Sequence, residues 1–217
     1  MIEVPVFNSK GEKIETLSVD EQRLGGEVRT DLLKQALVRY HANRRQGTVK
    51  TKSRGQVAGS TRKLYKQKGT GNARVGSGRT NIRRGGGMAF RKEPRDYSKR
   101  MPTKARRLAR NSALLSKLQS QDALIIDQLS LDSPKTKTIA QVFEALNIDR
   151  SCLLTLAQSD RNVYLSARNL PRTEVTTVGE LNAWSICNKK KMLLTKDAAQ
   201  QLFQAEQSPD RDKPVAG

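Results

Sequence analysis

The sequence predicts an α/β fold, a mostly parallel sheet flanked by helices as a three-layer sandwich, with a long irregular basic loop inserted after the first long helix. Short apolar runs alternate with amphipathic helical patterns in the second half of the chain, which is typical of parallel sheets. A stretch rich in Gly, Arg and Lys, without helical or strand periodicity, precedes that half. We expect a globular domain of residues 1–43 and 101–207, a loop of residues 44–100 and a disordered tail of residues 208–217.

The elements next to the loop follow from local patterns. Residues 2–7 predict a short strand. Thr30 or Asp31 can cap a helix, whose apolar face is formed by Leu32, Leu33, Ala36, Leu37 and Tyr40. After the loop, Pro102 suits the first turn of a helix whose apolar stripe continues to Leu118.

Strands and helices then alternate to the end of the domain. Apolar runs predict strands at residues 123–127, 152–157, 174–178 and 191–194. Helices are expected from Ser133-Pro134 onward and at residues 162–169, 179–186 and 197–205, the last capped by Thr195. Asp127 and Asp132 are interpreted as solvated caps.

The charge of the chain is concentrated in one segment. The 217 residues include 41 Lys and Arg against 21 Asp and Glu, a net charge of +20. Between Arg44 and Arg110 there are 22 basic residues and only two acids, Glu93 and Asp96, which leaves 19 of each sign elsewhere. Ten of the 15 glycines lie between residues 44 and 99. Such a segment buries little apolar surface, so we expect it to be disordered alone and ordered against a polyanion.

Several classes of function lack their sequence signals. No apolar run is long enough for a membrane span, and the N-terminus does not resemble a signal peptide. A P-loop is absent, and Gly69-Thr-Gly71 does not complete a dinucleotide fingerprint, because Arg74 stands at the third glycine position. We therefore predict no enzyme, no catalytic residues, no metal and no cofactor.

The cysteines and the histidine give no nucleophilic site. Cys152 lies in an apolar run and is expected to be a small buried residue. Cys187 precedes three lysines that could lower the pKa of its thiol, but no histidine is near it in the sequence. His41 ends a predicted helix beside Arg44 and Arg45, where a surface or RNA-contacting role is expected.

The basic loop has three possible interpretations: a solvated tail, a membrane-binding surface or a nucleic-acid-binding segment. The loop is internal, which argues against a tail, and its glycines argue against a basic amphipathic helix. Arg and Lys interspersed with Gly suit phosphate contacts and stacking on exposed bases of RNA. Tyr65, Phe90 and Tyr97 could stack on bases or could anchor the loop. The candidate RNA-binding residues are Arg44, Arg45, Lys50, Lys52, Arg54, Arg62, Lys63, Tyr65, Lys66, Lys68, Arg74, Arg79, Arg83, Arg84, Arg95 and Tyr97.

Several motifs in order resemble one known family. Lys63-Leu-Tyr-Lys-Gln-Lys-Gly-Thr-Gly-Asn-Ala-Arg74 and Arg84-Gly-Gly-Gly-Met-Ala-Phe90 are similar to the central motifs of the bacterial-type L-four family of large-subunit ribosomal proteins. Segments 106–109, 133–137 and 165–171 resemble further motifs of that family. Two departures stand out: Arg91 and Lys92 replace a usual Gly-Pro, and Asn72 replaces a usual Arg.

The resemblance implies a structural constituent of the large ribosomal subunit that binds rRNA early in subunit assembly. Its loop would thread through rRNA and help line the polypeptide exit tunnel, with a tip formed by Lys66, Gln67, Lys68, Gly69, Thr70 and Gly71. The implied partners are large-subunit rRNA, neighbouring large-subunit ribosomal proteins and the nascent polypeptide, with no membrane; the implied location is cytoplasmic and ribosome-bound. An alternative is a repressor that binds its own messenger RNA off the ribosome.

Overall fold

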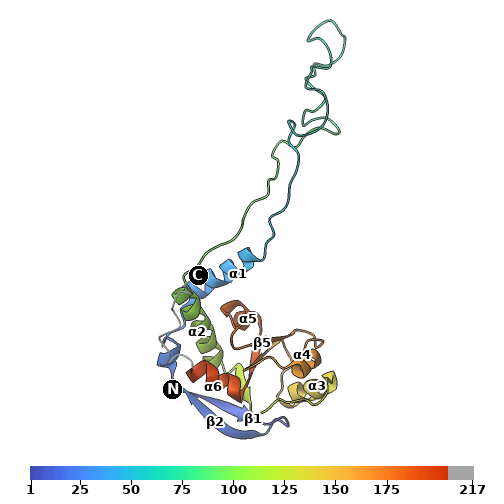
Figure 1. Cartoon of the computed structure of the whole chain (residues 1–217). Coiled ribbons are helices and arrows are strands. Elements are labelled where there is room, and N and C mark those ends of the chain that lie inside the picture. The colour runs from blue at the N-terminus through green and yellow to red at the C-terminus, as the bar shows by residue number, and fades with distance from the viewer. Residues whose placement is uncertain (205–217) are drawn as a thin grey trace, which may run out of the picture. The chain divides into compact units, whose positions relative to one another are not determined.

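The computed structural model describes residues 1–204, which form two compact units (Figure 1). The globular unit comprises Met1–Tyr40 and the chain from Arg100 onward, and the loop unit comprises His41–Lys99. The predicted tail, residues 208–217, lies outside the described residues, as does residue 205 of the last predicted helix.

Along the described chain, one long helix precedes the loop and another follows it. In order, the elements are β1 (Ile2–Phe7), β2 (Lys13–Val19), the 3-10 helix η1 (Glu21–Leu24), α1 (Thr30–Asn43), α2 (Thr103–Gln119), β3 (Ala123–Ile126), α3 (Thr136–Ala145), β4 (Cys152–Leu156), α4 (Arg161–Ala167), β5 (Thr173–Thr177), α5 (Ala183–Asn188), β6 (Lys191–Thr195) and α6 (Lys196–Gln204).

The six strands of the described residues join one sheet in the order β2-β1-β3-β6-β4-β5. Only β1 and β2 pair antiparallel, and the other pairs are parallel. β6 lies between β3 and β4, where Leu194 is opposite Ile125 and Leu193 is opposite Leu154. The prediction of a mostly parallel sheet is confirmed.

Each face of the sheet is covered by its own set of helices. Successive side chains of a strand point to opposite faces, so Met192 and Leu194 join a core with α1, α2, α5 and α6. Leu193 joins a second core with Ile139 of α3 and Val163 of α4. Helices, sheet and helices therefore form the predicted three-layer sandwich.

Two elements were not predicted. β2 is an edge strand in which only Val19 is buried, and its alternating charged residues give no apolar signal. η1 is a single turn capped by the Asp20 side chain, which accepts a hydrogen bond from the Gln22 amide. Neither element has the periodicity of a core-facing segment, so only pairing with β1 identifies β2.

The predicted starts of two helices were wrong. α5 begins at Ala183 and not at Gly179, because Asn182 caps it by accepting a hydrogen bond from the Ser185 amide at 2.9 Å. α3 begins at Thr136 and not at Ser133-Pro134, after Lys135 in an extended conformation. Consequently neither Asp127 nor Asp132 caps α3.

The predicted cap of the last helix is confirmed. The Thr195 hydroxyl accepts a hydrogen bond from the Ala198 amide at 3.3 Å. This bond satisfies an amide of the first turn of α6 that has no partner within the helix.

Candidate nucleic-acid interface

The loop unit consists of two arms, residues 44–65 and 73–99, joined by an apex of residues 66–72. Between residues 44 and 99 it contains no helix or strand and one isolated bridge, Lys63 with Ser77. At the base, the Lys99 amide donates to the side chain of Asn43 at 2.8 Å, and the Asn43 amide group donates to the Lys99 carbonyl at 3.4 Å. The two ends of the loop are therefore held together by one reciprocal pair.

Tyr97 forms the second closure of the arms. The guanidinium carbons of Arg45 and Arg95 lie 3.6 and 4.3 Å from the centre of its ring. Gly47, with a φ of +71°, lies against this cluster, and a Cβ there would be 2.1 Å from the Arg95 carbonyl oxygen. A hydrogen bond from Arg95 and the nearby positive charges hold the pKa of Tyr97 below its usual value.

The middle of the loop unit is packed around Gly87. This residue is the only buried one between His41 and Lys99. Its amide donates to the Arg79 carbonyl at 3.1 Å, and the amide of Met88 donates to the Lys52 carbonyl at 2.9 Å. A Cβ at Gly87 would lie 2.1 Å from the Arg54 amide nitrogen, so the two arms approach here more closely than a side chain allows.

The apex follows a short stretch of paired backbone. The Leu64 amide donates to the Gly76 carbonyl at 3.1 Å, and the Tyr65 hydroxyl donates to the Ala73 carbonyl. Gly69 and Gly71 have φ values of +82° and +70°, and no atom lies within 4 Å of the place that a Cβ would occupy at either residue. The apex backbone is thus open to contact from outside the loop unit.

The predicted RNA-binding cations are spread over both arms and the apex, and most of them are exposed. Three predicted residues are half-buried: Tyr65, Arg79 and Tyr97. The Arg79 guanidinium donates to the Val57 carbonyl at 2.9 Å, so this side chain braces the two arms. The exposed members are Arg44, Arg45, Lys50, Lys52, Arg54, Arg62, Lys63, Lys66, Lys68, Arg74, Arg83, Arg84 and Arg95.

The loop unit carries a large excess of positive charge. It contains 17 Lys and Arg but only Glu93 and Asp96 as acids. Glu93 pairs with Arg91, and Asp96 accepts hydrogen bonds from the amide and hydroxyl of Ser98. These Ser98 bonds lower the pKa of Asp96. Such a surface has the electrostatic footprint of a phosphate-binding segment.

Sequence reasoning missed two of the residues that hold the arms together, Asn43 and Thr51. Asn43 and Thr51 are uncharged and lie in no motif, yet Asn43 pairs with Lys99, and the Thr51 hydroxyl accepts from the Lys92 amide at 2.7 Å. Asparagine and threonine commonly bond to nearby backbone. Their distant partners, 56 and 41 residues away, could not be identified from sequence alone.

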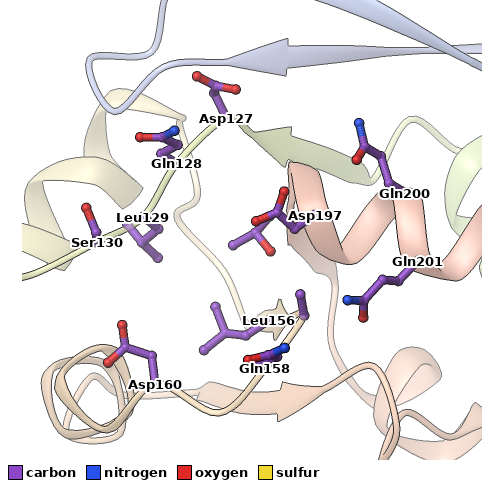
Figure 2. Close-up of a pocket in the computed structure, with 12 residues that line it drawn as sticks. Asp127, Gln128, Leu129, Ser130, Leu156, Gln158, Asp160, Asp197, Gln200 and Gln201 are labelled. Carbon is purple, nitrogen blue, oxygen red and sulfur yellow. The ribbon is translucent and has the colours of Figure 1, made fainter.

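The globular unit has a cleft at the carboxyl ends of β3, β4 and β6, where α/β folds commonly bind ligands (Figure 2). The cleft measures about 610 Å³ and is lined by three carboxylates, Asp127, Asp160 and Asp197; among residues 1–204, no Lys or Arg lines it. Asp160 caps α4 through the amides of Asn162 and Val163. An anionic lining disfavours nucleotide phosphates, which argues against a nucleotide-dependent enzyme.

Nearby acids and bases of the globular unit are paired with each other. Lys196 lies 3.7 Å from Asp127 and also pairs with Glu15, contacts that raise the pKa of its ammonium group, with the Glu15 hydrogen bond as the largest cause. Among residues 1–204 no group of three or more His, Cys, Asp or Glu is placed to hold a metal ion. Within the same range, no helix has the length and apolarity of a membrane span.

The two cysteines have different environments. Cys152 is fully buried on β4, as predicted, and burial raises the pKa of its thiol to about 12. Cys187 is exposed on α5, but partial desolvation raises its pKa, against the weaker effect of Lys117. The expectation that the following lysines lower the pKa of Cys187 is therefore wrong.

Comparison with known proteins gives one consistent result. Residues 17–205 match the family described as the Ribosomal protein L4/L1 family. The chain is 43% identical over 201 residues to the large ribosomal subunit protein uL4 of Dehalococcoides mccartyi, covering 93% of this chain and 96% of the relative. It is 40% identical over 199 residues to the uL4 protein of Rhodopirellula baltica, with 91% and 90% covered. For Pelotomaculum thermopropionicum uL4 the identity is 44% over 195 residues, with 90% and 94% covered. The chain therefore belongs to the ribosomal protein L4/L1 family, whose members are structural and non-enzymatic.

Proposed function

We propose that the chain is a structural constituent of the large ribosomal subunit and binds large-subunit rRNA through the basic loop, residues 44–100. The observation that carries this proposal is the exposure of the loop cations. Thirteen predicted RNA-binding cations are exposed, while Gly87 is the only buried residue of the loop unit. Phosphate neutralisation requires such accessible cations, and open glycine backbone allows close approach to RNA.

The apex is the part of the loop that we assign to the polypeptide exit tunnel. The segment lies beyond the Tyr65–Ala73 hydrogen bond, the last that joins the arms, and all its residues are exposed. These residues are Lys66, Gln67, Lys68, Gly69, Thr70 and Gly71. Within a large subunit this segment would contact rRNA and the nascent polypeptide. Early entry into assembly, contacts with neighbouring ribosomal proteins and a cytoplasmic, ribosome-bound location belong to the same proposal.

Binding to rRNA fragments over a range of salt concentrations tests the proposal. Each phosphate contact contributes about 0.7 to 0.9 to the slope of log affinity against log salt. A variant without three loop charges should therefore lose about two units of slope. Its substitutions are Lys66→Gln, Lys68→Gln and Arg74→Gln, and the matched control on exposed positions of the globular unit carries Lys10→Gln, Lys34→Gln and Lys137→Gln. Equal slopes for both variants would contradict the assignment to the loop.

A loop replacement gives a second test. Because Asn43 and Lys99 are hydrogen-bonded, a short Gly-Ser linker can replace residues 44–98 without separating these ends. We expect this variant to keep its far-UV circular dichroism and to lose most of its rRNA affinity. Undiminished affinity would place the interface on the globular unit.

A second candidate function is repression through messenger RNA. Phosphate contacts carry no sequence information, so the same exposed cations could bind a structured leader of the chain's own message. A competition experiment between that leader and an rRNA fragment of equal length separates the two candidates. Preferential binding of the leader would favour the repressor.

A further inference from the structure

We propose that Phe90 is a base-stacking residue: its ring packs against an unpaired nucleobase of the RNA that the loop binds. The inference rests on the proposed function, because it requires the loop to bind RNA. It assigns to one side chain a role that phosphate contacts cannot have: a contact with a base.

The backbone around Phe90 forms a bulge. The Met88 amide donates to the Lys52 carbonyl at 2.9 Å, and the Thr51 amide donates to the Lys92 carbonyl at 3.0 Å. Thr51 and Lys52 are consecutive, whereas Met88 and Lys92 are four residues apart. Three residues of the second arm, 89–91, therefore have no counterpart on the first arm.

Phe90 is the central residue of this bulge and is 94% exposed. With this exposure, the ring makes little contact with either arm. Exposure of a complete aromatic ring to water is unfavourable, and a partner that covers it stabilises the complex. Hydrogen bonds on both sides fix where the bulge begins and ends, which limits the positions that the ring can occupy.

The other two aromatic residues of the loop already have contacts within it. The Tyr65 hydroxyl donates to the Ala73 carbonyl below the apex. The Tyr97 ring lies beside the guanidinium groups of Arg45 and Arg95 at the base. Both tyrosines thus anchor the loop, and Phe90 is left as the aromatic group that can accept an external partner.

The charge around the bulge indicates the class of partner. Glu93 is the one acid between residues 79 and 95, which also contain six bases: Arg79, Arg83, Arg84, Arg91, Lys92 and Arg95. An exposed apolar ring in a segment rich in cations matches a nucleotide, whose base stacks while its phosphate is neutralised. A protein partner would need an apolar socket within an acidic surface, so RNA is the simpler match.

The experiment measures rRNA affinity of full-length variants at position 90. Phe90→Ala should bind about 5- to 150-fold more weakly, the usual effect of removing one stacked aromatic side chain. The salt slope should stay unchanged, because no charge is removed. Phe90→Trp should retain affinity, whereas Phe90→Leu, which is apolar but has no aromatic face, should resemble Phe90→Ala. Ile82→Ala is the matched control, since Ile82 is 89% exposed in the same unit.

Fluorescence of Phe90→Trp provides a readout that a merely structural role would not change. The wild-type chain contains Trp184 as its only tryptophan, so the difference between the two spectra reports position 90. We expect rRNA to quench this difference signal by stacking.

The outcomes separate the two proposals. A wild-type chain without salt-dependent rRNA affinity would overturn both. If the wild type binds but Phe90→Leu binds equally well and the tryptophan is not quenched, the stacking proposal alone is overturned. The stacking proposal alone is also overturned if Phe90→Ala keeps its affinity for rRNA but binds more weakly than wild type once neighbouring ribosomal proteins are added. That result would assign Phe90 to a protein contact.

Discussion

The guanidinium carbon of Arg45 lies 3.6 Å from the centre of the Tyr97 ring, although the two residues are 52 positions apart in the sequence. Together with the Asn43–Lys99 pair, this contact closes the base of the basic loop. Cation–π contacts of this kind contribute about 0.5–1 kcal/mol at exposed sites. The base of the loop is thus held by a few weak contacts, each of which can be tested separately.

Tyr97 should titrate below the usual pKa of a tyrosine. A hydrogen bond from Arg95 and the charges of Arg45, Arg95 and Lys92 favour the phenolate. Arg95→Gln should therefore raise the pKa of Tyr97 toward its ordinary value, because it removes the largest of these effects. A pH titration of ¹³C-labelled tyrosine by NMR measures this change, and Tyr97→Phe identifies the signal. An unchanged titration in Arg95→Gln would contradict the predicted hydrogen bond.

Gly87→Ala should weaken rRNA binding by about 5- to 150-fold. A Cβ at this position would lie 2.1 Å from the Arg54 amide nitrogen, and overpacking of this kind costs about 1–3 kcal/mol. The arms would have to separate, and the cations would lose their relative positions. Gly78→Ala is the matched control, because no atom lies within 4 Å of its Cβ position. Filter binding of both variants checks the prediction, and equal affinities would contradict it.

Asp122→Asn should destabilise the globular unit by about 1–3 kcal/mol at neutral pH. The largely buried Asp122 carboxylate lies 2.9 Å from the Lys190 ammonium and 3.2 Å from that of Lys191. Burial opposes its ionisation, but the hydrogen bonds and charges of both lysines outweigh burial and lower the pKa of Asp122.

The stabilisation by Asp122 has a definite pH dependence. A lowered folded-state pKa stabilises the fold above the unfolded-state value of about 3.9, and this stabilisation is lost as the pH falls through the folded-state pKa. Urea denaturation should therefore show a smaller difference between wild type and Asp122→Asn in acid than at neutral pH. Asp149→Asn, at an exposed position, serves as control. A difference that is independent of pH would exclude an ionic contribution.

Cys187 and Cys152 should differ in their reaction with a thiol reagent. Cys187 is exposed, whereas Cys152 is fully buried and its pKa is raised to about 12. At pH 8 the native chain should react at one thiol, and the second should react only when the globular unit unfolds. Titration with Ellman's reagent, with and without urea, measures this difference. A native Cys187→Ser variant that still reacts rapidly would contradict the burial of Cys152.

The sequence alone predicted the fold class of the globular unit, a mostly parallel sheet covered by helices. Apolar runs and helical stripes are local signals, and the parallel sheet follows from their alternation. The same signals failed for β2, because its charged residues lie on an exposed edge. They also misplaced the start of α5, where the cap formed by Asn182 and Ser185 decides the boundary.

For the candidate interface, the sequence determined that the net charge is concentrated in one glycine-rich segment, and its motifs indicated the family. It left Tyr65, Phe90 and Tyr97 equivalent as stacking or anchoring groups. Only the tertiary structure separated them, by giving both tyrosines partners within the loop and leaving Phe90 on a bulge. The physical reason is that net charge and hydrophobic periodicity depend only on residues that are close together in the sequence. The partners of a side chain depend on contacts between the arms, which form only when residues far apart in the sequence meet.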